Sequence, residues 1–572
     1  MDKIKKFISK APHSRVIFTG IWTIPISFVC ITSIMRTWGG ELTVVGYLLA
    51  ALYALLGCVV ITGIHLYQHL VWGKNEFTVR SALHNADLPS KRKIQATHPP
   101  VPDKYLCDAP TGYILGKQGH KYVRVNPSDD SLCALVCSSP GSGKSVTMMA
   151  SLIGNYASIR PRFLTIATDP KGELSASFTD LPYVHVISLT DRSKYGYDPL
   201  YWYSPDMTDD EMEPYLKTIA EALISDSGGE KNQYFWANAR RIMIGLIAWM
   251  MRSGRNFPEI MTAISTHNVM TLVDQALQEA SNSKIVKKNL APYQGKTGED
   301  MESITTEVTT SIDIFAGSEA MSWALGESPR RATPADTDLE NSLFLQIDQE
   351  NIAQYAPFIR LFYTQIFQHL IKSRNEDFVK SRFPIWVLLE EAPLYGAIPH
   401  LNDFLSTCRS RMVSVYIVCQ SISQLEGAYG KEKAATLLDD CLVKVVLGVA
   451  NNETAEVFSK MSGQYEEDRD SIHAKGLLSL PDSYNYSKER RRVMDPEEFF
   501  RLKDEDSVVL FIDGKFMKVQ KIKYYNDRML SSLLEYRKKE QAHSEVASIR
   551  MNPVDLVLDN DFTRSYEKEF PV

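Results

Sequence analysis

The chain has 572 residues, of which 44% are apolar and 23% are charged. This composition excludes a disordered, collagen-like or wholly membrane-embedded chain, and the length suggests about two to four domains. The 63 Lys and Arg against 69 Asp and Glu give a net charge of −6, which excludes a general polybasic binder of nucleic acid. The eight cysteines include no C-x-x-C pair, so neither a disulfide scaffold nor a zinc ribbon is expected.

Two long uncharged stretches stand near the N-terminus. They are Val16–Met35, with 20 residues, and Thr43–Ile64, with 22. Each is long enough to cross about 30 Å of hydrocarbon as a helix, so we predict a membrane anchor of two spans. A cleaved signal peptide would have a shorter apolar region, and the alternative is a buried helical hairpin of a soluble domain. Basic residues stand before the first stretch and after the second, at Lys3, Lys5, Lys6, Lys10, Arg15, Lys74, Arg80, Lys91, Arg92 and Lys93.

A glycine-rich loop follows a buried strand that we expect over 131–137. Gly141 and Gly143 let the backbone N–H groups face a phosphate, and the next helix adds its positive N-terminus. Lys144 can then reach the β- and γ-phosphates, and the Ser145 hydroxyl can bind Mg²⁺. This order matches the Walker A motif, although Ser138 replaces its usual first glycine, and a chance Gly/Ser turn is the alternative. The predicted nucleotide-binding residues of the loop are Ser138, Ser139, Pro140, Gly141, Ser142, Gly143, Lys144 and Ser145.

A second predicted strand ends in two acids. The apolar run Ile385–Leu389 leads directly into Glu390 and Glu391, which is the Walker B arrangement. The first acid would hold Mg²⁺, and the second would orient and deprotonate the attacking water. Glu390 stands where most such strands have Asp, and its extra methylene changes the metal geometry. A solvated acid pair at a strand end is the alternative.

Two further strand ends are expected at the same edge of the sheet. The run 163–168 leads into Asp169 and Lys171, and the run 413–419 leads into Gln420. In an open parallel sheet the groups that face the ligand gather at the carboxyl ends of the strands. We therefore predict that Gln420 senses the γ-phosphate or the attacking water, and that Asp169 or Lys171 borders the nucleotide. A helix cap for Asp169 and a loop hydrogen bond for Gln420 are the alternatives.

These motifs together resemble the type IV coupling proteins of bacterial conjugation and type IV secretion, the TraG/TraD-like membrane ATPases. The stretches that carry the likeness are 169–174 (DPKGEL), 388–393 (LLEEAP), 420–430 (QSISQLEGAYG), 234–236 (YFW), 451–455 (NNETA) and 490–498 (RRRVMDPEE), within about residues 110–525. The resemblance implies a RecA-like motor that assembles into a homohexamer, uses ATP and Mg²⁺, and sits in the bacterial inner membrane. Its implied partners are single-stranded DNA with an attached relaxase, or effector proteins, and the proteins of the secretion channel.

The resemblance also implies roles for single residues. It assigns metal binding to Glu390 together with Ser145, and activation of the water to Glu391. It makes Gln420 the sensor and Arg409 the finger that reaches a neighbouring subunit's site. Arg411 is the second candidate for that finger, and a surface salt bridge is the alternative for either arginine.

The predicted fold class is α/β, with a RecA-like P-loop domain, an inserted all-α domain and the N-terminal anchor of two transmembrane helices. Between 205 and 321 the pattern is helical, and Ile242–Met251 is too short to span a bilayer, so we predict a buried helix there. Basic groups at 284–288 and 488–492 could contact DNA, with solvated surface as the alternative. The predicted boundaries are 1–70 for the anchor, 71–204 and 322–530 for the nucleotide-binding domain, 205–321 for the all-α domain and 531–572 for a flexible tail.

Two other functions remain open at the level of sequence. One is a double-stranded DNA translocase of the chromosome-segregation type, which the motifs after Gln420 fit less well. The other is a docking receptor that binds nucleotide with little turnover, because Ser138 and Glu390 depart from the commoner residues. The sequence does not name the transported substrate.

The basic residues that flank the two predicted spans place both termini in the cytoplasm, because positively charged flanks stay on the cytoplasmic side of a membrane. A membrane-impermeant label added to intact cells should therefore leave a tag at either end unmodified. Labelling of either tag before the cells are broken would contradict this topology.

Overall fold

The structure is a computed structural model. It describes residues 100–127, 132–157, 161–225, 232–374, 383–473 and 483–548, and short helical pieces between Val29 and Val59. The chain divides into two compact units. One comprises Met1–Ala96 and Gln464–Arg491, and the other comprises Thr97–Gly463 and Arg492–Val572.

The smaller unit contains the N-terminal segment and a β-hairpin. The hairpin strands are β13 (Gln464–His473) and β14 (Ser483–Arg492). The first predicted span lies almost wholly outside the described residues, and the second is described, as helix, only at 46–48, 51–57 and 59. In the part of the chain that the structure describes, no helix is long and apolar enough to cross a membrane. The two spans therefore stay a prediction.

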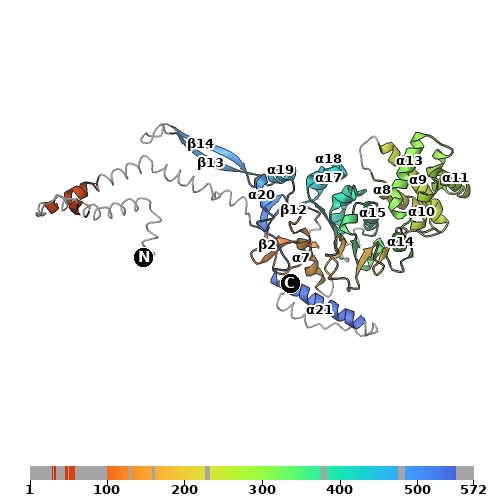
Figure 1. Ribbon diagram of the computed structural model, residues 1–572, viewed down its shortest axis with the longest axis horizontal. Coiled ribbons are helices and arrows are strands. Elements are labelled where there is room, and N and C mark those ends of the chain that lie inside the picture. The colour runs from red at the N-terminus through yellow and green to blue at the C-terminus, as the bar shows by residue number, and fades with distance from the viewer. Residues whose placement is uncertain are drawn as a thin grey trace. The chain divides into compact units, whose positions relative to one another are not determined.

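The larger unit is built on a sheet of twelve strands (Figure 1), in the order β1-β3-β2-β16-β15-β12-β4-β11-β10-β5-β9-β6. The strands from β12 to β6 run parallel, and the remaining five are antiparallel. The parallel strands are β4 (Ala134–Ser138), β5 (Leu164–Thr168), β6 (Val184–Ser188), β9 (Ser342–Gln346), β10 (Ile385–Leu389), β11 (Val413–Cys419) and β12 (Val443–Gly448). The antiparallel strands are β1 (Leu106–Cys107), β2 (Tyr113–Gln118), β3 (Lys121–Val125), β15 (Ser507–Ile512) and β16 (Lys515–Gln520).

Both faces of the parallel strands are buried, which explains why their sequences are continuous apolar runs. In β10, Ile385, Val387 and Leu389 belong to one hydrophobic core. The alternating residues Trp386 and Leu388 belong to a second core. Side chains of a strand point alternately to its two faces, so a single strand contributes to both cores.

Helices cover both faces of this sheet, and a helical region lies at one end of the larger unit (Figure 1). The covering helices are α7 (Lys144–Tyr156), α15 (Ala356–Ser373), α16 (Leu401–Cys408), α17 (Ile422–Tyr429), α18 (Lys431–Asp440), α19 (Asn452–Met461), α20 (Pro496–Arg501) and α21 (Arg528–Ser548). The helical region comprises α8 (Asp209–Leu223), α9 (Gln233–Arg252), α10 (Phe257–Thr266), α11 (Val269–Glu279), α12 (Lys284–Leu290), α13 (Glu299–Ile312) and α14 (Glu319–Ser322). A short parallel pair, β7 (Gly196–Tyr197) and β8 (Arg331–Ala332), joins the chain on either side of it.

The helical region is organised around α9. Ile242–Met251 lies within this helix and is buried throughout, which confirms the predicted buried helix. The helices around it begin at clear signals: Thr208 and Asn256 each form a capping box at the start of α8 and α10. The apolar stretch is therefore the centre of a helical core and not a membrane segment.

The prediction of a flexible tail over 531–572 is wrong for its first part. Helix α21 runs from Arg528 to Ser548, and its residues Leu530, Leu533 and Arg537 are buried. These three positions recur at the spacing of one helical face, so one face of the helix, with two leucines and an arginine, packs on the domain. The Arg537 guanidinium also forms an ion pair with Asp180. Residues 549–572 lie outside the described part.

Gly154 lets α7 pack closely on the segment before β2. A Cβ atom at this position would lie 1.9 Å from the Pro110 carbonyl oxygen. Gly154→Ala should therefore lower the melting temperature, because relieving such a clash costs about 1–3 kcal/mol. Gly427→Ala is the matched control, since a Cβ atom there meets nothing within 4 Å and alanine favours the helix α17. Equal melting temperatures for the two variants would contradict this account.

Candidate nucleotide-binding and catalytic site

The order of three strands brings the predicted site residues together. Strand β11 lies between β4 and β10 and pairs with both in parallel. The carboxyl ends of these strands therefore meet at one edge of the sheet, where β4 leads into the glycine-rich loop, β10 leads into Glu390 and β11 leads into Gln420. This is the convergence that the sequence predicts.

The glycine-rich loop curls as its glycines require. Gly141 and Gly143 have φ angles of 72° and 93°, in the left-handed region that favours glycine, and Gly143 precedes the first residue of α7. The Ser138 hydroxyl, at the end of β4, hydrogen-bonds the Ser142 hydroxyl at 2.7 Å, and both residues are buried. Serine at the position of the usual first glycine thus adds a hydrogen bond that closes the loop.

Lys144 lies between the two acids that follow β10. Its Nζ contacts Glu391 Oε1, and it is 3.5 Å from Glu390 Oε1. Both carboxylates are 4% exposed, so the lysine is the positive charge that makes their burial tolerable. A nucleotide phosphate at the loop would offer this ammonium a second kind of anionic partner.

Glu390 fits the role of a metal ligand. Its Oε1 is 3.4 Å from the Ser145 hydroxyl, so two hard oxygen donors lie beside the loop. Mg²⁺ in phosphate-transfer sites commonly takes one or two protein oxygens and completes its shell with water and phosphates. The pKa of Glu390 is raised to about 7, mainly by burial and also by the nearby charges of Asp169 and Glu391, while Lys144 opposes this shift. Among the described residues no group of three His, Cys, Asp or Glu could hold a metal by itself.

Glu391 and Gln420 are in direct contact. The Gln420 side-chain amide donates to both carboxylate oxygens of Glu391, at 3.3 Å and 3.2 Å. Glu391 itself has a φ of 60°, an uncommon conformation for a residue other than glycine, and this turns the chain sharply after β10. An amide that orients a carboxylate beside a lysine is an arrangement that can position a water molecule.

Two tyrosines that the sequence did not single out hold the end of β10. The Tyr395 hydroxyl donates to the backbone carbonyl of Glu390, and the Tyr363 hydroxyl bonds Thr168 at 2.7 Å and the carbonyl of Leu388 at 3.2 Å. Tyr395 comes only four residues after Glu391, and this closeness in sequence was a weak indication that it contacts the end of β10. Tyr363 lies on α15 and gave none.

Asp169 and Lys171 differ in what they contact. The Asp169 carboxylate is buried and accepts hydrogen bonds from the Leu174 and Ser175 amides and from the Ser175 hydroxyl. It therefore closes a turn that follows β5, and it caps no helix, because the described chain between β5 and β6 contains none. Its negative charge also lies near Glu390. Lys171 is exposed in the same turn. A nucleotide contact for either residue stays a prediction.

The two candidate arginines precede β11, at the edge opposite the site. Arg409 is exposed, and within the described residues its side chain forms no hydrogen bond or ion pair. The Arg411 side chain instead folds back on its own helix end, donating to the Thr407 carbonyl at 2.9 Å. No salt bridge of the described residues involves either arginine, so the salt-bridge alternative has no support here.

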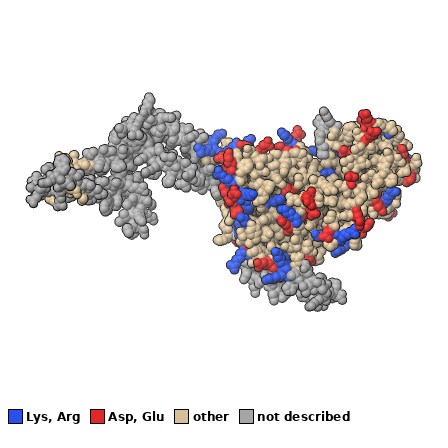
Figure 2. All heavy atoms as spheres, in the orientation of Figure 1, with Lys and Arg blue, Asp and Glu red and all other residues tan. Residues whose placement is uncertain are grey.

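The basic groups that could contact DNA are partly engaged by acids. Lys288 on α12 pairs with Glu213, Arg492 pairs with Glu456 at 2.8 Å, and Arg490 lies 4.0 Å from Glu466. Figure 2 shows basic and acidic side chains interspersed over the visible face of the described residues. The visible face therefore shows no large surface of positive charge alone, in keeping with the net charge of −6.

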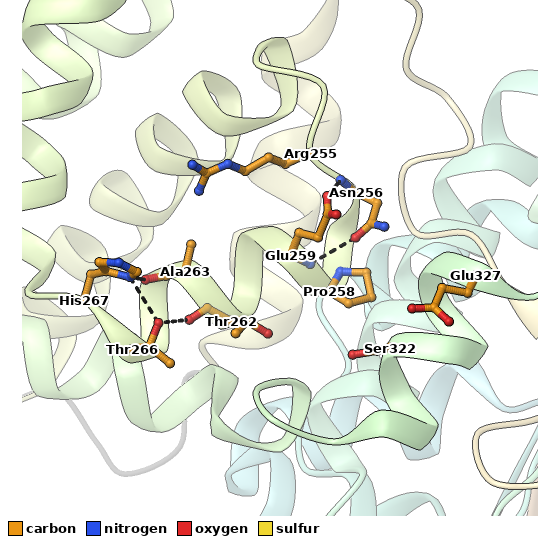
Figure 3. Close-up of a pocket in the computed structure, with 10 residues that line it drawn as sticks. All are labelled: Arg255, Asn256, Pro258, Glu259, Thr262, Ala263, Thr266, His267, Ser322 and Glu327. Atoms are coloured by element: carbon orange, nitrogen blue, oxygen red, sulfur yellow. Dashed lines mark hydrogen bonds between the residues drawn. The ribbon is translucent and has the colours of Figure 1, made fainter.

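A hollow of about 480 Å³ lies in the helical region, lined mainly by α10 and the turn around Ser322 and Glu327 (Figure 3). Several of its polar groups already have partners. Asn256 and Glu259 exchange capping hydrogen bonds, and Thr266 donates to the Thr262 carbonyl. None of the residues around the glycine-rich loop lines it, so it is separate from the nucleotide site.

Comparison with known proteins gives relatives of low identity. Protein VirD4 of Agrobacterium fabrum (strain C58 / ATCC 33970) is 23% identical over 393 residues, which are 65% of this chain and 56% of VirD4. The chain spans about half the length of the curated relatives it matches. The plasmid coupling protein TrwB, solved with the non-hydrolysable GTP analogue GDPNP, has a TM-score of 0.57 and 18% identity over 72% of this chain and 89% of TrwB. TrwB solved with ADP and Mg²⁺ has a TM-score of 0.55 and 17% identity over 70% and 88% of the two chains.

The fold of the larger unit is therefore that of TrwB, a mixed α/β fold on a central sheet, as the sequence predicted. The predicted family resemblance is confirmed by a family model, which covers well over half of the chain. Residues 77–552 match the model of the type IV secretory system conjugative DNA transfer proteins, and this chain belongs to that family.

Proposed function

We propose that this chain is the coupling ATPase of a bacterial type IV secretion system. It recruits a relaxase bound to single-stranded DNA, or an effector protein, and drives it to the secretion channel by hydrolysing ATP. The observation that carries this proposal is the contact of Lys144 with Glu390 and Glu391, and of Glu391 with Gln420, at the carboxyl edge of three adjacent strands. Family membership and the TrwB complexes with nucleotide and with Mg²⁺ support it.

The residues of the loop bind and orient the nucleotide. The loop amides and the N-terminus of α7 face the phosphates, and Lys144 holds the β- and γ-phosphates. Ser145 and Glu390 would hold the metal. Bound Mg²⁺ supplies positive charge that neutralises the phosphate oxygens. The raised pKa of Glu390 means that metal binding there displaces a proton at neutral pH and below.

Glu391 acts as the general base. Its carboxylate orients a water molecule and accepts a proton from it as the water attacks the γ-phosphate. The bond from the γ-phosphorus to the bridging oxygen breaks, and ADP leaves with that oxygen. Gln420 holds that carboxylate through both oxygens, and it can exchange these bonds for one to the water or to a phosphate oxygen. This exchange is how Gln420 would sense the state of the nucleotide.

The position of Arg409, at the opposite edge of the sheet, favours an arginine finger that acts in a neighbouring subunit. Arg409 precedes β11 and Gln420 follows it, so the seven residues of the strand separate the two by about 20 Å. Arg409 therefore cannot reach the site of its own subunit. Its exposed side chain suits a contact with a neighbour, which is the arrangement of a homohexameric ring.

The N-terminal segment anchors the protein in the inner membrane with both termini in the cytoplasm. In the described part of the second apolar stretch, Leu48, Leu52, Leu55 and Leu56 are 66%, 58%, 56% and 58% exposed. A row of leucines that stays exposed to water is unfavourable, and contact with lipid removes this cost.

Lys144→Ala tests the proposed function. The variant should still insert into the membrane, because Lys144 lies outside both predicted spans. Its melting temperature is measured as well, because Glu390 and Glu391 lose their positive partner. The variant should lose DNA transfer, and its ATP hydrolysis should fall by at least ~10²-fold, because the charge that holds the phosphates is gone. Lys121→Ala, an exposed lysine of β3, is the control. Normal transfer by a stably expressed Lys144→Ala protein would refute the motor.

The same hydrolysis assay distinguishes the alternatives. A coupling protein of this kind should be stimulated by single-stranded DNA. Stimulation by double-stranded DNA alone would favour a translocase of the chromosome-segregation type. Nucleotide binding without turnover, with or without DNA, would favour a docking receptor.

Arg409→Ala should bind ATP almost normally and hydrolyse it poorly. A finger contributed by a neighbour stabilises charge that appears only in the transition state, so its loss should cost on the order of 10³-fold in rate. Lys121→Ala, the exposed lysine of β3, is again the control. Arg411→Ala tests the second candidate, whose side chain folds back on its own helix. A binding assay and a hydrolysis assay on each variant separate the two effects.

Mixing tests whether the finger acts in a neighbouring site. Glu391→Gln subunits keep Arg409, and Arg409→Ala subunits keep Glu391, so mixed rings should regain some activity by pairing an intact site with a donated arginine. A co-assembled mixture as inactive as its components would show that Arg409 does not act in this way, and Arg411 would become the candidate.

A further inference from the structure

Two lysines from the C-terminal part of the chain lie against the glycine-rich loop. Lys521 follows β16, and its side chain passes Gly143, where a Cβ atom would lie 3.6 Å from Lys521 Cδ. Lys503 follows α20, and its Nζ lies 3.4 Å from the Pro140 carbonyl oxygen. They are more than 350 positions from the loop in sequence, and no motif marks them.

Lys521 is a buried charge without an ion pair. Its residue is 7% exposed, and Nζ donates to the backbone carbonyls of Leu447, at 3.3 Å, and Leu502, at 3.5 Å. These two contacts use two of the three protons of an ammonium group. Among the described residues no carboxylate lies within ion-pair distance of it, and the nearby Asp506 is paired with Lys523 at 2.7 Å.

A buried lysine charge lowers the stability of the folded protein unless an anion lies near it. Burial lowers the pKa of Lys521, and Asp506 acts against this shift. The position of the Lys521 side chain suggests which anion balances its charge, because the side chain lies beside Gly143, the last residue before α7. The N-terminus of that helix and the curled loop form a binding place for phosphate.

We propose that Lys521 is a positioning residue for the nucleotide, whose buried ammonium places a second positive charge behind the loop for the polyphosphate. This inference rests on the proposed nucleotide binding and extends it to a segment outside both Walker motifs. Lys521 also links the loop to the end of β12 through Leu447 and to α20 through Leu502. The C-terminal strands thereby contact the nucleotide site.

Lys503 has a smaller part in the same arrangement. Its side chain is exposed, so water and salt screen its charge. It borders the outer side of the loop at Pro140 and Gly141. We expect Lys503→Met to weaken nucleotide binding by no more than about twofold, in keeping with an exposed charge.

The test measures dissociation constants on the full-length protein, by calorimetry, for Mg-ADP and for inorganic pyrophosphate. Lys521→Met keeps the aliphatic stem, Lys521→Gln keeps a donor for the two carbonyls, and Lys521→Arg keeps the charge. The matched control is Lys518→Met, a lysine of the same region whose Nζ pairs with Glu505 at 2.7 Å away from the loop. Melting temperatures are recorded for every variant.

We expect Lys521→Met and Lys521→Gln to weaken both ligands by about tenfold at low salt, with a smaller loss at high salt, since a nearby charge at an intermediate dielectric is worth that much or more. Lys521→Arg should stay within about threefold of the unchanged protein, and Lys518→Met should not differ from it. If Lys521→Met does not fold, the Gln variant answers the same question.

Three results would overturn the inference. One is a lower melting temperature with unchanged affinity, which would make Lys521 a structural residue only. Another is a loss of Mg-ADP affinity with unchanged pyrophosphate affinity, which would place the contact on the nucleoside. The third is a loss for Lys521→Arg equal to that for Lys521→Gln. Failure of the unchanged protein to bind either ligand would overturn the proposed function, and this inference with it.

Discussion

The pairing of β11 between β4 and β10 is the constraint on which the candidate site depends. Lys144 and Glu391 are 247 positions apart in sequence, and they meet because these strands run parallel and end at the same edge. Ile417 of β11 pairs with Leu135 on one side and with Leu389 on the other, so the ends of the strands are aligned. A shift of register by one residue would turn the side chains to the opposite face.

The sequence predicted this convergence because each motif is local and parallel strands share a carboxyl edge. It could not predict what the side chains do there. Asp169 closes its own turn by accepting hydrogen bonds from Ser175. Ser138, which stands where the motif usually has glycine, forms a hydrogen bond with Ser142. The tail prediction failed for residues 531–548 because composition does not reveal that two leucines and an arginine on one face of a helix pack on the domain. Lys521 was missed for a related reason, since only the fold brings β16 beside the loop.

Charge balance connects these features. Lys144 contacts two buried carboxylates, and Asp169 adds a third negative group nearby. If Lys144 turned to a phosphate, the carboxylates would lose their positive partner, which is unfavourable in a buried place. A metal bound at Glu390, as proposed above, would restore a positive partner to this carboxylate, whose pKa burial raises. Nucleotide and metal should therefore bind together better than either binds alone.

The two ends of strand β11 lie near two different candidate site residues. Its carboxyl end carries Gln420, which contacts Glu391, and its amino end follows Arg409, which is exposed at the opposite edge. A rigid strand buried on both faces cannot bring its two ends to one ligand. If both ends serve nucleotide hydrolysis, each must serve a different nucleotide, and the subunits must be arranged head to tail. Repetition of such a contact closes into a ring when the rotation between subunits permits it. On the proposed role of Arg409, the sheet that assembles one half of the site would therefore require a neighbouring subunit to supply the other half.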